Sequence, residues 1–159
     1  PVVLMFSSGW SFANNLFLYL GENLQPHYAI KEFRDTSDPD ILKNNSFIGY
    51  DGIMGHIYLD EGSMPVSELA TLEMSAQYLP CGCNGNQLMA LPENGAFLSL
   101  EPDSPDFLLV DWDSPLVDSG LPLPFTCGSR TLQAVSPDHA GQSVPCGAQR
   151  DIGPFEYCQ

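Results

Sequence analysis

Two segments of the chain carry an Asn-Asn pair in the same apolar frame, thirty residues apart. Residues 11–18 read SFANNLFL, and residues 41–48 read ILKNNSFI. Similarity at a fixed interval of about 20 to 50 residues is typical of repeat architectures, in which one structural unit stacks on the next. We therefore interpret the two segments as equivalent corners in two successive turns of a coil.

Short apolar runs form a second series with nearly the same period. Residues 2–6, 28–33 and 56–59 recur at intervals of 26 to 28 residues. Apolar runs of about four to eight residues between turn signals predict strands. Two interleaved strand series of similar period predict an all-β fold, a parallel β-helix of about three rungs.

Stacked rungs place equivalent side chains directly above one another. Asn15 and Asn45 are then expected to form a ladder of side-chain amides at an inward bend, each satisfying its neighbour's donors and acceptors. Phe17 and Phe47 are expected to stack beside them in the apolar core.

Residues 63–78 break the strand pattern. Ser63 suits an N-cap, Pro65 suits a first turn, and several apolar residues from Val66 onward share one helical face. We expect a short lateral α-helix over about 65–78, a loop over 80–86, and further strands at 87–91, 97–100 and 107–110. Residues 1–120 would thus hold the rungs, and residues 121–159 an irregular, disulfide-rich C-terminal cap.

Five cysteines occupy the C-terminal half, flanked by Gly, Pro and Asn. Disulfides are favoured over a zinc site, because Cys-Gly-Cys is not the usual ligand spacing and no His is near it. They imply an oxidising compartment, and the odd count leaves one thiol free or paired outside the chain. The candidates are Cys81, Cys83, Cys127, Cys146 and Cys158.

The net charge of −15, from twenty acidic and five basic residues, bears on possible partners. It disfavours nucleic acid, anionic membranes and polyuronate substrates. Residues 2–20 are uncharged and mostly apolar, but they include Ser and Asn side chains and no basic flank, so we expect no membrane span.

Clustered carboxylates raise the questions of calcium and of catalysis. Asp111, Asp113 and Asp118 are candidate Ca²⁺ ligands, although turn formation is the favoured interpretation of all three. Lys31, Arg34 and Lys43 offer only a thin basic groove for a polysaccharide lyase. We therefore assign no catalytic residue and no cofactor, apart from this possible structural calcium.

Four motifs in order resemble one family. DSPLVDSG (113–120) and RDIGPFEY (150–157) are similar to the last rung, GSPxIDxG, and the tail, DIGAxE[YF], of secreted bacterial right-handed parallel β-helix proteins of the pectate-lyase-like type. SDPDILKNNSFIG (37–49) and HIYLDEGSMPVSELATLE (56–73) resemble the preceding rungs and lateral helix.

Pro154 stands where the family usually has Ala, and the insert 121–149 is longer than usual. The resemblance implies a right-handed coil outside the cytoplasm, but no activity, because the family includes lyases, hydrolases and adhesive or structural proteins.

A coil that starts on residue 2 presents an apolar end, and solenoid ends need a cap. We expect residues 1–20 to be covered by a protein partner or by upstream rungs of the same precursor. The favoured function is a non-catalytic scaffold, adhesin or assembly subunit that is extracellular, periplasmic or on the cell surface. The alternatives are the C-terminal part of a carbohydrate-active enzyme (a polysaccharide lyase or glycosidase) and a Ca²⁺-dependent glycan-binding module.

Overall fold

A computed structural model describes residues 2–5, 9–22, 24–33, 39–59, 65–75, 80–91 and 96–158. The chain winds through three rungs of three short strands each. The first rung is β1 (Val2–Met5), β2 (Trp10–Ala13) and β3 (Leu16–Leu18); the second is β4 (His27–Phe33), β5 (Pro39–Lys43) and β6 (Ser46–Ile48); the third is β7 (Gly55–Leu59), β8 (Cys83–Asn84) and β9 (Gln87–Met89).

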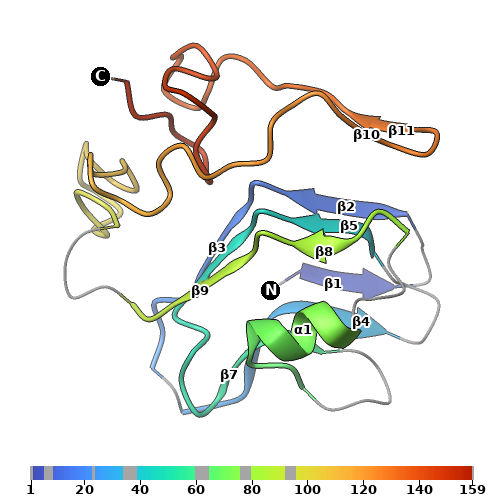
Figure 1. The fold of residues 1–159 in the computed structure, drawn as a ribbon. Helices are drawn as coiled ribbons and strands as arrows, with labels where there is room; N and C mark the ends of the chain where they lie inside the picture. Colours follow the sequence, from blue (N-terminus) through green and yellow to red (C-terminus); the bar gives the residue numbers. More distant parts are fainter. Residues whose placement is uncertain are drawn as a thin grey trace.

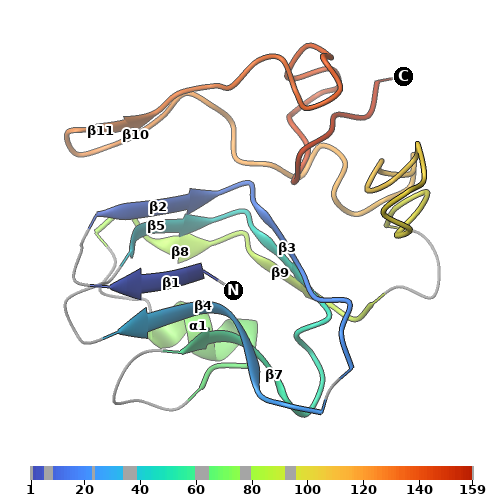
Figure 2. The ribbon, with the colours of Figure 1, turned by 180° about the vertical axis from the view of Figure 1, so that it is seen from behind.

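Equivalent strands of successive rungs pair in parallel. They form three sheets, β1-β4-β7, β2-β5-β8 and β3-β6-β9, and the coil is right-handed (Figures 1 and 2). The register places Val2 opposite Ile30, and Phe17 opposite Phe47. The predicted right-handed parallel β-helix of three rungs is confirmed.

The inward-facing side chains of the three sheets make one core. Middle-rung residues are more deeply buried than first-rung residues, since a rung covers them on each side: Phe47 is fully buried, whereas Phe17 of the first rung is only partly so. Burial of each large side chain contributes roughly 1.5–3 kcal/mol. The buried members are Phe12, Ala29, Ile30, Leu42, Phe47, Tyr50, Ile57, Tyr58, Val66 and Leu72.

Helix α1 (Leu69–Ser75) lies against the third rung (Figures 1 and 2) and places Leu72 in the core. It starts later than the predicted residue 65, because Val66 is extended and exchanges backbone hydrogen bonds with Tyr58 (N···O 2.8 and 3.2 Å). The candidate cap Ser63 and residues 76–78 lie outside the described residues. The helix thus covers the third-rung end of the coil.

The sequence-based prediction was wrong for two segments. Residues 80–86 are not all loop, because they contain β8 and return the chain to the third rung. The strands predicted at 97–100 and 107–110 are reduced to isolated bridges, Phe97 with Val110 and Ser99 with Phe107. Turns fill that region instead, and they bury a second cluster that covers the outer face of β3-β6-β9. Its buried members are Ile48, Ala96, Val110, Leu116 and Ile152.

The C-terminal segment runs along the side of the coil, beside β2-β5-β8 (Figure 1). It is mostly irregular, but it contains a hairpin that the sequence did not predict, β10 (Phe125–Cys127) paired with β11 (Arg130–Leu132). We call residues 125–132 the hairpin strap. Two disulfides, Cys81–Cys127 and Cys146–Cys158, hold this segment, and Cys83 is free.

The two disulfides indicate an oxidising compartment. Within the described ranges, no helix has both the length and the apolarity that crossing a bilayer requires.

Candidate interaction site at the first-rung end

Three asparagines form a continuous ladder at one corner of the coil. Asn15 donates its backbone N–H and its Nδ2 to Asn45 Oδ1, both at 3.0 Å. Asn45 repeats the pattern, with its backbone N–H and Nδ2 donating to Asn86 Oδ1 at 3.1 and 2.9 Å. The amide oxygens of Asn45 and Asn86 therefore each accept two hydrogen bonds from the rung before them.

Asn86 was missed in the sequence, although a signal for it exists. CNGNQLM (83–89) matches FANNLFL (12–18) once Gly85 is aligned with Asn14. The separation from Asn45 is 41 residues because the third rung contains α1. Asn14, Asn44 and Gly85 share positive φ values of 59°, 50° and 70°, the left-handed region that Gly and Asn tolerate.

The first asparagine of each Asn-Asn pair points outward and holds the C-terminal segment. Asn14 Nδ2 donates to Leu121 O at 3.1 Å, and the Leu121 N–H donates back to Asn14 Oδ1. Asn44 Nδ2 donates to Ser119 O at 2.9 Å. The same corner thus joins the rungs inside and fastens residues 119–121 outside.

The ladder is open at its first rung. Asn15 Oδ1 accepts no hydrogen bond from any described residue, whereas the equivalent oxygens of Asn45 and Asn86 each accept two. Asn15 is exposed, and Asn45 is fully buried. The amide oxygen at the end of the coil is therefore an available acceptor.

The amide nitrogen of Asn15 is also diverted. Asn45 Nδ2 donates across the rung boundary to Phe12 O of the first rung, at 3.0 Å. Asn86 Nδ2 donates in the same way to Leu42 O of the second rung, at 2.9 Å. Asn15 Nδ2 donates instead to Ala13 O, within its own rung, at 3.1 Å. Ala13 O therefore takes the place of the carbonyl that the preceding rung supplies to Asn45 and to Asn86.

Two open grooves meet at this corner, and Asn14 and Asn15 belong to both. The groove along β3 has a volume of about 460 Å³ and is lined also by Leu16, Leu18, Leu108, Gly153 and Pro154. The groove along β2 has a volume of about 240 Å³ and is lined by Ser11, Ala13, Leu123, Leu132, Gln133, Val135 and Arg150. Every rung residue in either lining belongs to the first rung.

Aromatic side chains also lie at the first-rung end of the coil. Phe17 stacks on Phe47, with ring centroids 4.9 Å apart and an interplanar angle of 11°. Trp10, which is 43% exposed, stacks on Phe12 at 6.5 Å. The first rung therefore presents partly exposed aromatic side chains at two places, Phe17 in β3 and Trp10 at the start of β2.

The three candidate calcium ligands are not assembled into a site. Among the residues whose placement is known, no three His, Cys, Asp or Glu side chains are grouped as a metal ion requires. Asp111 Oδ1 accepts the Trp112 N–H, and Asp118 Oδ1 accepts the Gln149 N–H, both at 2.7 Å. The Asp111 contact is local, whereas Asp118 binds a segment 31 residues later in the chain.

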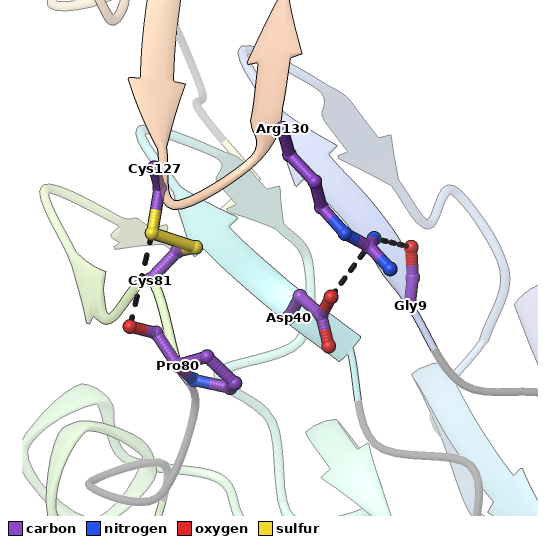
Figure 3. Close-up of polar contacts among 6 residues, drawn as sticks. All are labelled: Gly9, Asp40, Pro80, Cys81, Cys127 and Arg130. Carbon is purple, nitrogen blue, oxygen red and sulfur yellow. Dashed lines mark hydrogen bonds and ion pairs between the residues drawn. A yellow bond between two sulfur atoms is a disulfide. The ribbon is translucent and has the colours of Figure 1, made fainter.

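Two basic residues make structural contacts: Lys43, a candidate for the lyase groove, and Arg130, which was not a candidate. Figure 3 shows Arg130 of the hairpin strap reaching Gly9 O and Asp40, the latter through an ion pair of 2.8 Å. Lys43 Nζ donates to Asn84 Oδ1 at 2.6 Å and lies 5.6 Å from the Phe125 ring centroid. Arg34 lies outside the described residues.

Cys83, the free thiol, lies in the third rung and is partly buried. It pairs in register with Leu42 and packs against the core. Burial raises the pKa of the Cys83 thiol to about 11, and the nearby charge of Glu73 adds to the shift.

Comparison with models of protein families, with curated proteins and with solved structures finds no match for the chain. The fold assignment therefore rests on the strand register and the ladder.

Proposed function

We propose that the chain is a non-catalytic extracellular or cell-surface β-helix protein that acts as a scaffold or assembly subunit, with its first-rung end docked on another polypeptide segment. The observation that carries the proposal is the open amide of Asn15. Among the described residues, its oxygen receives neither of the two donors that the Asn45 and Asn86 oxygens receive, and its nitrogen donates to Ala13 O instead of to a preceding rung.

The two ends of the coil differ in a way that supports this function. At the third-rung end, α1 buries Leu72 to 1% exposure. At the first-rung end, the described residues leave Phe17 and Trp10 partly exposed. Exposed strand edges are templates for further pairing, and solenoids need their ends covered. A docked segment would cover the edges of β2 and β3.

The proposed location follows from the disulfides and the charge. Disulfides persist outside reducing compartments, and a net charge of −15 favours solubility. Membership of the secreted pectate-lyase-like β-helix family is part of the same proposal. It is supported by the fold and by the resemblance in residues 113–120 and 150–157.

Site-specific photo-crosslinking in the cells that produce the protein tests the docking. Trp10→p-benzoylphenylalanine places the photoreactive group at the first-rung end, and the same change at Trp112, which is 69% exposed, is the matched control. We expect adducts from position 10 but not from position 112, with the joined peptides mapped by mass spectrometry. No adduct from position 10, or equal adducts from both positions, would refute the proposed function.

A further inference from the structure

We infer that the segment docked on the first-rung end is one more β-helical rung, with its chain parallel to β2 and β3 and an asparagine at its inward corner. The inference rests on the proposed function and specifies the chemistry of the partner. Its basis is the repeating hydrogen-bond pattern between rungs. Within the described part of the chain the pattern stops at Asn15, whose oxygen accepts no hydrogen bond and whose Nδ2 donates to Ala13 O.

The ladder defines what an incoming corner must supply. Asn45 Oδ1 accepts the backbone N–H and the Nδ2 of Asn15, and Asn86 Oδ1 accepts the same two groups of Asn45. Asn15 Oδ1 is suited to the same pair of donors. Only an asparagine, or the longer glutamine with altered geometry, carries a side-chain amide N–H beside its backbone N–H.

The incoming rung must also supply an acceptor. Asn45 Nδ2 donates to the carbonyl of Phe12, three residues before Asn15 in the preceding rung. By the same offset, Asn15 Nδ2 would leave Ala13 O and donate to the carbonyl three residues before the partner's asparagine. The corner would therefore make three hydrogen bonds between the incoming rung and the first rung: two to Asn15 Oδ1 and one from Asn15 Nδ2. A shift of the incoming strand by one residue would break all three.

Side-chain positions extend the pattern beyond the corner. Phe17, two residues after Asn15, stacks on Phe47 of the next rung. The partner should carry an apolar residue two positions after its own asparagine, to stack on the open face of Phe17. The partner's strands before and after its corner would lie in the two grooves that meet at Asn15, one along β2 and the other along β3.

A second copy of this chain does not meet these requirements. Head-to-tail stacking is obstructed because α1 covers the third-rung end with Leu72. Head-to-head stacking about a twofold axis reverses the chain direction, so the donors would not fall in register with Asn15 Oδ1. The occupant is therefore a rung from elsewhere, and its Asn-x-apolar corner distinguishes it.

A peptide of residues 39–50, PDILKNNSFIGY, tests the inference because it is the chain's own second-rung corner. It is titrated into isotope-labelled protein while the side-chain amide resonances of Asn15 are followed by NMR. The matched control peptide carries Asn45→Leu. We expect the native peptide to shift the Asn15 resonances and to bind about tenfold more tightly than the control peptide, since it adds hydrogen bonds to an unsatisfied group.

Two protein variants localise the effect. Asn15→Leu should abolish the preference between the two peptides, and Asn84→Leu, in the third rung and outside the ladder, should retain it. Because the peptide pair is compared on unaltered protein, the test does not depend on the stability of Asn15→Leu.

Equal affinity for the two peptides, or binding that leaves Asn15 unshifted, would overturn the inference. So would concentration-dependent dimerisation that shifts the Asn15 resonances without peptide, because the occupant would then be a second copy. These results leave the docking proposal standing as long as position 10 forms cross-links in cells. Absence of those cross-links refutes the proposed function itself.

Discussion

Asn45 Nδ2 donates to Asn86 Oδ1 at 2.9 Å, inside a core where the Asn45 side chain has no exposed surface. The same nitrogen donates to Phe12 O, and the Asn45 oxygen accepts two hydrogen bonds from Asn15. A buried amide with every group engaged fixes the register of three rungs at once. Asn15 makes similar bonds toward the second rung, and no other described residue donates to its side-chain oxygen.

This difference predicts unequal costs for the same substitution. Asn45→Leu leaves buried polar groups of the neighbouring rungs without partners and should lower the free energy of unfolding by about 3 kcal/mol. Asn15→Leu, at the exposed end, should cost about 1 kcal/mol. Urea denaturation followed by circular dichroism measures both, and equal costs would contradict the ladder as the source of register.

The repeat of the rungs could be predicted from the sequence because stacked rungs require similar residues at equivalent positions. Asn15 and Asn45 occur in equivalent frames thirty residues apart, and the strand series around residues 2, 28 and 56 has a similar interval of 26 to 28 residues. A coil has few ways to satisfy two interleaved series of nearly equal period. The sequence therefore predicted the architecture and the position of one corner, although no comparison with known proteins supports it.

Asn86 and the hairpin strap were not readable in the same way. Insertion of α1 lengthens the third rung, so Asn86 falls outside the thirty-residue period, and Cys83 replaces the Phe12 and Leu42 that mark the earlier rungs. The strap depends on contacts distant in sequence, such as Arg130 with Asp40. Neither local pattern nor spacing encodes such a contact.

Cys83 should be almost unreactive in the folded protein. Burial raises the pKa of its thiol to about 11, so the thiolate that attacks thiol reagents is scarce at pH 8. We expect modification by a disulfide reagent at pH 8 to be slower by on the order of a hundredfold than for an ordinary exposed cysteine. In urea the rate should return to the ordinary value. Rapid modification in buffer alone would show that the third rung opens at Cys83.

The hairpin strap spans all three rungs. Arg130 contacts Gly9, next to the first rung, and Asp40 in the second, while Cys127 is bonded to Cys81 just before the third (Figure 3). Replacing both cysteines, Cys81→Ser with Cys127→Ser, should release the strap and lower stability by about 2–4 kcal/mol.

Trypsin reports on the release, because Arg130 lies within the strap. The variant without the Cys81–Cys127 bond should be cleaved after Arg130 faster than the unaltered protein, since local opening exposes the backbone. The variant that lacks the other disulfide, Cys146→Ser with Cys158→Ser, is the control and should be cleaved there at the original rate. Equal cleavage in all three proteins would mean that the ion pair alone holds the strap.

Two carboxylates of the C-terminal segment predict a pH dependence. Burial raises the pKa of Asp151, which accepts the N–H groups of Asp118 and Tyr157 through its two oxygens, and the pKa of Glu156. Between their ordinary values near 4 and the raised folded values, the native state binds more protons than the unfolded state. The free energy of unfolding should therefore fall as the pH rises through that window toward neutrality.

Glu156→Gln separates this effect from the general repulsion of a chain with net charge −15. Glutamine removes the titration while one oxygen remains to accept the Asp151 N–H, so the slope of stability against pH should be smaller than in the unaltered protein. Glu101→Gln, at an exposed turn, removes the same formal charge and should leave the slope nearly unchanged. If both variants lower the slope equally, long-range repulsion rather than burial of Glu156 determines the pH dependence, because the two substitutions remove the same formal charge and only Glu156→Gln removes a buried carboxylate.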